Sequence, residues 1–99
     1  MVITQLEAQV ASHQWETLQR AYQVVIDQPL PPYIHHTFLV QDASQPEIWR
    51  ILTIWKSHQA LEDYRASVET PSGGLMFRAA GAEPTLTRLK VVLSTLTSQ

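Results

Sequence analysis

The sequence predicts an α+β fold of the ferredoxin-like type, with the element order βαββαβ and a four-stranded antiparallel sheet. In residues 48–55, IWRILTIW, both alternating sets of side chains are mostly apolar, as in a central strand covered on both faces. A strand followed by a helix occurs twice, each helix opening with Ser-His-Gln, which fits a duplicated β-α-β unit. The length of 99 residues, 44% of them hydrophobic and 16% charged, suits one globular domain over residues 1–99.

The first strand and the first helix are predicted near the N-terminus. In residues 2–10, mostly apolar side chains alternate with mostly polar ones, which indicates a strand with one buried face. Apolar residues then recur at helical spacing, so we expect a helix over residues 12–27 with Ser12 as its N-cap. Three prolines at positions 29, 31 and 32 end this helix, because proline lacks the amide hydrogen and restricts the residue before it.

The second and third strands are predicted to form an antiparallel hairpin. Residues 33–41 form the second strand, in which Ile34, His36, Phe38 and Val40 are expected to share one face. The short segment QDASQP at 41–46 is rich in turn-forming residues and leads into the strand at 48–55. A right-handed crossover places strands one and three side by side at the centre of the sheet.

The second half of the chain supplies two more helices and the last strand. Ser57 is the expected cap of a helix whose apolar stripe is Ala60, Leu61, Tyr64 and Val68. Thr70-Pro71 predicts the start of a short helix that Gly81 ends. The last strand is expected over residues 86–93, with Leu89, Val91 and Leu93 inward and Arg88 and Lys90 outward.

The small number of helices predicts that a second protein surface covers part of the sheet. Two long helices cover only one face of a four-stranded sheet, yet both faces of the central strand are apolar. Burying three large side chains on the second face is worth roughly 5–8 kcal/mol, and leaving them in water would create an adhesive patch. We therefore expect a homodimer in which two sheets pack together.

Composition excludes several classes of function. The formal net charge is −2, from seven basic and nine acidic residues, and the charges are scattered, so no nucleic-acid interface is expected. No apolar run approaches the ~20 residues of a membrane span, and the N-terminus does not read as a signal peptide. The chain has no cysteine and no histidine pair at helical metal-site spacing. We expect a soluble cytoplasmic protein without a metal.

Several segments resemble the antibiotic biosynthesis monooxygenase-like family of dimeric α+β barrels. The matching residues are Phe38-Leu39-Val40-Gln41, Pro46 to Trp49, Thr53-Ile54-Trp55, Ala60-Leu61, Tyr64, Glu69-Thr70-Pro71, Met76-Phe77-Arg78 and Gly81-Ala82-Glu83-Pro84-Thr85. The resemblance implies two βαββαβ units that form a dimeric barrel. It also implies a pocket between sheet and helices for an electron-rich phenol, which reacts with oxygen without a metal, flavin or other cofactor.

Five residues are the candidate binding residues, and no catalytic residue is assigned. By the resemblance, Trp55 matches the family tryptophan and would stack on a substrate; Tyr22, Tyr64 and His36 would hydrogen-bond it, and Arg78 would steady its charge. Each also has a structural interpretation. Trp55 and the two tyrosines would be core residues, His36 a histidine satisfied by a hydrogen bond, and Arg78 part of a surface ion pair.

Two functions remain open at this point. The first is a cofactor-independent monooxygenase-like enzyme that acts on a small aromatic or polyketide-type molecule. The second is a non-catalytic homodimer that binds a small ligand or a protein partner. The chain contains no asparagine, a residue credited with catalysis in the family, which favours the second function, whereas the family resemblance favours the first.

Overall fold

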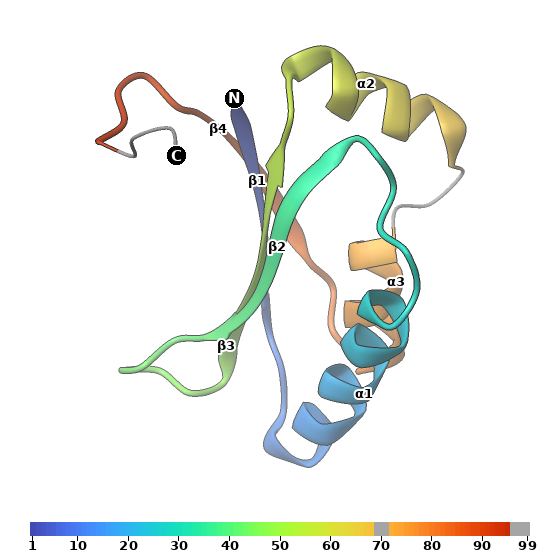
Figure 1. Cartoon of the computed structure of the whole chain (residues 1–99). Coiled ribbons are helices and arrows are strands. Elements are labelled where there is room, and N and C mark those ends of the chain that lie inside the picture. The colour runs from blue at the N-terminus through green and yellow to red at the C-terminus, as the bar shows by residue number, and fades with distance from the viewer. Residues whose placement is uncertain (69–71, 96–99) are drawn as a thin grey trace.

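The computed structural model describes residues 1–68 and 72–95, and its centre is a four-stranded antiparallel sheet in the order β2-β3-β1-β4. The elements are β1 (Val2–Gln9), the 3-10 turn η1 (Ser12–Gln14), α1 (Trp15–Ile26), β2 (Ile34–Gln41), β3 (Ile48–Trp55), α2 (His58–Ser67), α3 (Ser72–Ala79) and β4 (Thr85–Lys90). All three helices lie on one side of the sheet (Figure 1). The ferredoxin-like class and the central position of strands one and three are confirmed.

The two faces of the sheet differ in how well they are covered. On β3, Trp49, Ile51, Thr53 and Trp55 are buried, whereas the intervening residues are only half-buried. The buried set packs under the helices and defines the helix-covered face. The opposite set, with its neighbours on the other strands, defines the open face. The expectation from the sequence that the helices cover only one face of the sheet is therefore confirmed.

Two clusters form the core on the helix-covered face. The larger joins α1 and α3 to the middle of the sheet and contains Leu18, Trp49 and Phe77. The smaller joins α2 to β1 and β3 and contains Trp55, Leu61 and Tyr64. At Gly73 a side chain would come within 2.5 Å of Leu6 Cδ1, so glycine lets α3 approach β1 closely.

Helix ends follow the predicted chemistry at two of three places. The Ser57 hydroxyl accepts a hydrogen bond from the Ala60 amide at 3.0 Å, so it caps α2 as predicted. Gly81, at φ 73°, follows α3, where the Ala82 amide bonds the Phe77 carbonyl and the Gly81 amide bonds the Arg78 carbonyl. These are the two bonds of a Schellman motif.

The predicted Ser12 cap is wrong. The chain enters the first helix through η1, and the side chain of Ser12 makes no capping bond. A 3-10 turn forms its own i to i+3 bonds, here from the Gln14 amide to the Ala11 carbonyl at 2.8 Å, which replaces a side-chain cap. The predicted Thr70-Pro71 start of the third helix lies outside the described residues.

An irregularity in β2 overturns one predicted face. The pairing with β3 shifts between Ile34, opposite Trp55, and His36, opposite Ile54. A bulge of this kind inserts one residue and changes the alternation. Ile34 therefore lies on the helix-covered face, while His36 and Phe38 lie on the open face.

The last strand also differs from its prediction. It ends at Lys90 rather than Leu93, and its faces are reversed. Leu89 pairs with Ile3 on the open face, whereas Arg88 pairs with Thr4 on the helix-covered side. Arg88 donates to Glu62 of α2 at 2.9 Å. At this edge strand a long cationic side chain can cover the sheet and still keep its charged end in water.

No helix among residues 1–68 and 72–95 has the length and hydropathy needed to cross a membrane.

Candidate functional site

A cavity of about 250 Å³ lies between the helix-covered face and the three helices. Its inner wall is made by buried side chains of β1 and β3, including Thr4, Ile51, Thr53 and Trp55. Exposed apolar side chains, among them Ile26, Leu30 and Leu86, also border it. A cavity of roughly 150 Å³ is enough to hold benzene, so this one has room for more than a single aromatic ring.

Four of the five predicted binding residues line this cavity. They are Tyr22 from α1, Trp55 from β3, Tyr64 from α2 and Arg78 from α3. The sequence pattern placed the tyrosines on the apolar stripes of the two long helices, and the fold turns both stripes toward the same space.

His36 does not line the cavity, so its predicted place in the pocket is wrong. The bulge in β2 puts it on the open face, where its ring meets the ring of Phe38 edge-on at a centroid distance of 4.4 Å. The sequence correctly placed His36 and Phe38 on one face. It did not show which face the helices cover.

Trp55 and Tyr64 form the aromatic part of the wall. Their rings are 5.1 Å apart at an angle of 45°, and their side chains are 5% and 8% exposed. The Trp55 indole donates to the Thr4 hydroxyl at 2.9 Å, which fixes the orientation of the ring. Trp55 is thus both a core residue and a cavity residue, so the two interpretations of it are compatible.

Several hydroxyl groups lie within this mostly apolar wall. The Tyr64 hydroxyl lies 3.4 Å from the Ser72 hydroxyl and accepts from the Ser72 amide at the same distance. From α1, the Tyr22 hydroxyl donates to the Thr37 hydroxyl of β2 at 3.5 Å. These bonds are long, so a ligand with a polar edge can compete for either phenol.

Two guanidinium groups border the cavity as well. Arg78 donates to Glu83 at 3.1 Å, and both side chains are at least half exposed. Arg65 of α2 is the second, and no sequence pattern singled it out. Consecutive residues on a helix point in different directions, so the place of Arg65 after Tyr64 does not by itself predict that it reaches the cavity.

The titratable groups that line the cavity limit its chemistry. Among its described lining residues there is no histidine, aspartate or glutamate, and no cluster of three potential metal ligands occurs among residues 1–68 and 72–95. Phenols and guanidiniums donate hydrogen bonds and stabilise negative charge. The lining can therefore stabilise an anion by hydrogen bonds and charge.

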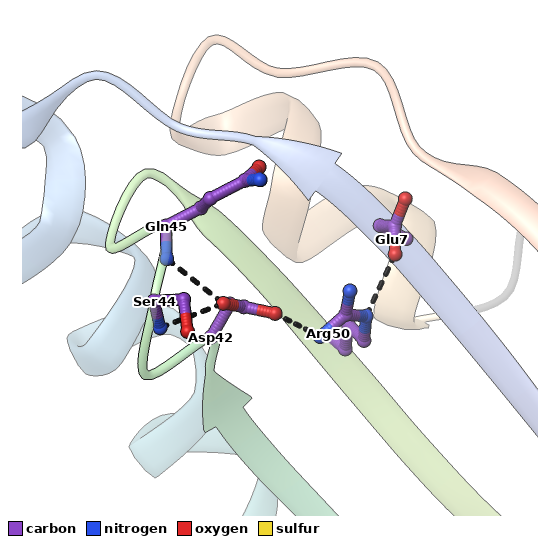
Figure 2. Close-up of polar contacts among 5 residues, drawn as sticks. All are labelled: Glu7, Asp42, Ser44, Gln45 and Arg50. Carbon is purple, nitrogen blue, oxygen red and sulfur yellow. Dashed lines mark hydrogen bonds and ion pairs between the residues drawn. The ribbon is translucent and has the colours of Figure 1, made fainter.

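A separate ionic cluster lies on the open face, at the end away from the cavity wall. Arg50 of β3 donates to Glu7 of β1 at 2.7 Å and to Asp42 at 3.0 Å (Figure 2). The Asp42 carboxylate also accepts from the amides of Gln45 and Ser44 at 2.8 and 2.9 Å.

The cluster has a structural role. The Gln45 amide, followed by Arg50 and the Ser44 amide, holds the pKa of Asp42 below its usual value, while Glu7 and then Asp42 raise the pKa of Arg50. Each residue of the cluster bonds at least one other. Through Arg50, these bonds connect the turn between β2 and β3 to strand β1 and so stabilise the pairing of β1 with β3. Arg50 is conspicuous in the sequence because its strand is otherwise mostly apolar. Its partners could not be predicted without knowing how β1 and β2 pair with β3.

The fold and the cavity together define a class of protein: a ferredoxin-like α+β domain with a ligand-sized space between sheet and helices. Solved structures share this architecture. A proposed antibiotic biosynthesis monooxygenase from Deinococcus radiodurans superposes with a TM-score of 0.74 at 12% identity, covering 100% of both chains. A conserved protein from Methanosarcina mazei gives 0.71 at 15% identity over 90% of each chain.

A third structure is SnoaB, a cofactor-independent oxygenase from Streptomyces nogalater, with a TM-score of 0.63 at 14% identity over 95% of each chain. The sequence matches no family model and no curated protein. The chain therefore shares the fold of antibiotic biosynthesis monooxygenases, and the resemblance seen in the sequence is confirmed at the level of the fold.

Proposed function

We propose that this protein is a cofactor-independent monooxygenase-like protein that binds a small aromatic or polyketide-type molecule in the cavity. One observation carries the proposal: the Trp55–Tyr64 pair lines a mostly apolar space of about 250 Å³, and aromatic rings pack well against aromatic walls. The fold shared with SnoaB supports the oxygenase half of the proposal.

The reaction that fits this wall begins with an electron-rich phenol. The substrate loses its phenolic proton to solvent, which returns it to the oxygen atom that leaves as water. The phenols of Tyr22 and Tyr64 together with Arg78 stabilise the resulting phenolate by hydrogen bonds and charge. The phenolate then reduces dioxygen. One oxygen atom enters the ring as a second carbonyl, giving a quinone, and the other leaves as water, so the substrate supplies all electrons.

Oxygen uptake tests this proposal. Purified protein is incubated with mono- and polycyclic phenols, including 1-naphthol, without added metal or cofactor. Tyr64→Phe removes only a cavity hydroxyl, so we expect kcat/KM to fall about tenfold, the equivalent of one hydrogen bond. Tyr33→Phe is the matched control, because Tyr33 does not line the cavity. Absence of uptake above buffer with every phenol refutes the enzymatic half.

The second function is a non-catalytic module that binds the same kind of ligand. The lack of a histidine or carboxylate among the described lining residues favours it, because proton transfer in enzymes normally uses such groups. Calorimetry distinguishes the two functions: the module predicts saturable binding of a phenol that stimulates no oxygen uptake.

We also propose that the open face packs against a second copy of the chain. Apolar side chains gather at one end of it: Ile3, Phe38, Leu52, Ile54 and Leu89. Phe38 and Leu89 are 42% and 44% exposed in the single chain. Covering each half-exposed side chain of this size adds about 1 kcal/mol. Residues 91–95 also leave the sheet on the side away from the helices (Figure 1).

Light scattering tests the dimer. Wild type is expected to show twice the chain mass of 11.2 kDa at micromolar concentration. Phe38→Asp places a charge in the apolar end of the open face and is expected to give monomer. Val24→Asp is the matched control, because Val24 is an exposed apolar residue on α1. A wild-type monomer at this concentration contradicts the proposal.

A further inference from the structure

The charged side chains that line the cavity, among the described residues, share one sign. The protein has a formal net charge of −2, yet the two charged side chains among the described residues that line the cavity are both arginines, Arg65 and Arg78. Because neither aspartate nor glutamate shares that lining, the local field favours a negative group.

Both arginines border the cavity, and they come from adjoining helices. The Tyr64 and Ser72 hydroxyls lie 3.4 Å apart, so the end of α2 meets the start of α3. Arg65 lies in the last turn of α2 and lines the same cavity. Nη1 of Arg78 lies 4.0 Å from where a Cβ on Gly74 would sit, which places this nitrogen beside the first turn of α3.

The two guanidiniums have donors to spare. Arg65 forms no hydrogen bond or ion pair with any residue in the ranges 1–68 and 72–95. Arg78 uses Nη2 for Glu83, which leaves Nη1, the nitrogen beside Gly74, without a described partner. A guanidinium carries five N–H donors in a plane that matches a carboxylate.

We propose that the natural ligand is an aromatic acid: an aromatic body against Trp55 and Tyr64, and a carboxylate between Arg65 and Arg78. The inference rests on the proposed ligand-binding role of the cavity and adds its charge selectivity. An aromatic body matches the apolar wall. Because Glu83 pairs with Arg78, the two guanidiniums carry one positive charge in excess, which one carboxylate balances. Exposure of both side chains makes the selectivity sensitive to salt.

Calorimetry with a matched ligand pair tests the inference. The probes are 2-naphthoate and 2-naphthamide, which have nearly the same shape but differ in charge. Wild type is expected to bind the naphthoate at least about tenfold more tightly, in line with a charge-assisted hydrogen bond, and the preference should shrink as sodium chloride is added. The Arg65→Gln, Arg78→Gln double variant should bind both probes with the affinity that wild type shows for the amide.

Arg88→Gln is the control, because Arg88 bonds Glu62 and does not line the cavity; it should keep the wild-type preference. Equal affinities in wild type overturn the inference and leave the ligand-binding role intact. A preference that survives in the double variant overturns it too. Binding of neither probe contradicts the proposed binding role of the cavity as well.

Discussion

The three tryptophans give a sharp test of how the core is packed, because their indole N–H groups differ in whether they have a hydrogen-bond acceptor. Trp15 donates to the Val10 carbonyl at 2.8 Å and Trp55 to the Thr4 hydroxyl at 2.9 Å. Trp49 is 6% exposed, and its N–H has no partner among the described residues. Replacing each tryptophan with phenylalanine therefore removes a similar ring from three different hydrogen-bond environments.

The magnitudes follow from these environments. The smaller ring loses about 1 kcal/mol of apolar burial at each site. At Trp15 and Trp55 the change also breaks a hydrogen bond and strands its acceptor, at about 1–3 kcal/mol. At Trp49 it removes a buried donor without a described partner, which returns a similar amount. We expect Trp55→Phe and Trp15→Phe to lower the free energy of unfolding by about 2–4 kcal/mol, and Trp49→Phe to leave it unchanged or raise it.

Urea unfolding of the wild type and the three variants measures the difference. All four proteins are compared at one concentration, because association with a second copy would add to the apparent stability. The midpoint is expected to shift while the slope stays constant, since the fold is the same. If Trp49→Phe is as damaging as Trp55→Phe, the Trp49 N–H is satisfied in solution and the reasoning is wrong.

Other predictions concern the helix end and the ionic cluster. Gly81→Ala should lower the free energy of unfolding by about 1–2 kcal/mol, because alanine is strained at a φ of 73°. Gly74→Ala, inside α3 with no neighbour nearer than 4.0 Å, should raise it by about 1 kcal/mol; urea midpoints of both variants check the pair, and equal shifts contradict it. Asp42→Asn removes the ion pair with Arg50 and is compared with wild type from pH 7 downward. Since folding lowers the pKa of Asp42 below 3.8, the stability that its charge adds is present above this value and is lost as the pH falls through the lower folded pKa. The two proteins should therefore converge in acid, and a difference that persists at the lowest pH contradicts the assignment.

Much of the fold was predictable because its signals are local. The prolines after residue 28, the Ser57 cap and Gly81 each act through the backbone of their own neighbourhood, and all three lie where helices end or begin. The apolar residues on both alternating sets of residues 48–55 likewise predicted a central strand, and β3 lies between β2 and β1.

The errors arose where a distant contact decides the outcome. The bulge that separates Ile34 from His36 depends on pairing with β3, which the sequence of β2 does not reveal. The face that each β4 side chain takes depends on the register of β4 against β1, which pairs Arg88 with Thr4 and Leu89 with Ile3. An alternating pattern shows which residues share a face of a strand, but it does not show which face the helices cover.

Part of the candidate site was predictable from local sequence patterns. Trp55, Tyr22 and Tyr64 lie on apolar stripes, and any fold that closes these stripes brings them together. Arg65 was missed because an arginine on a helix surface carries no pattern of its own; its meaning comes from the cavity beside it. The partners of Arg50 were missed because they require the register of three strands.

The claim that the cavity binds the ligand can be tested by following the three indole N–H resonances by NMR during a titration with 1-naphthol. Trp55 lines the cavity, whereas Trp15 and Trp49 do not, so the latter two act as internal references. We expect the Trp55 resonance to move saturably while the other two stay in place. Calorimetric binding of 1-naphthol with an unmoved Trp55 resonance would show that the ligand binds elsewhere.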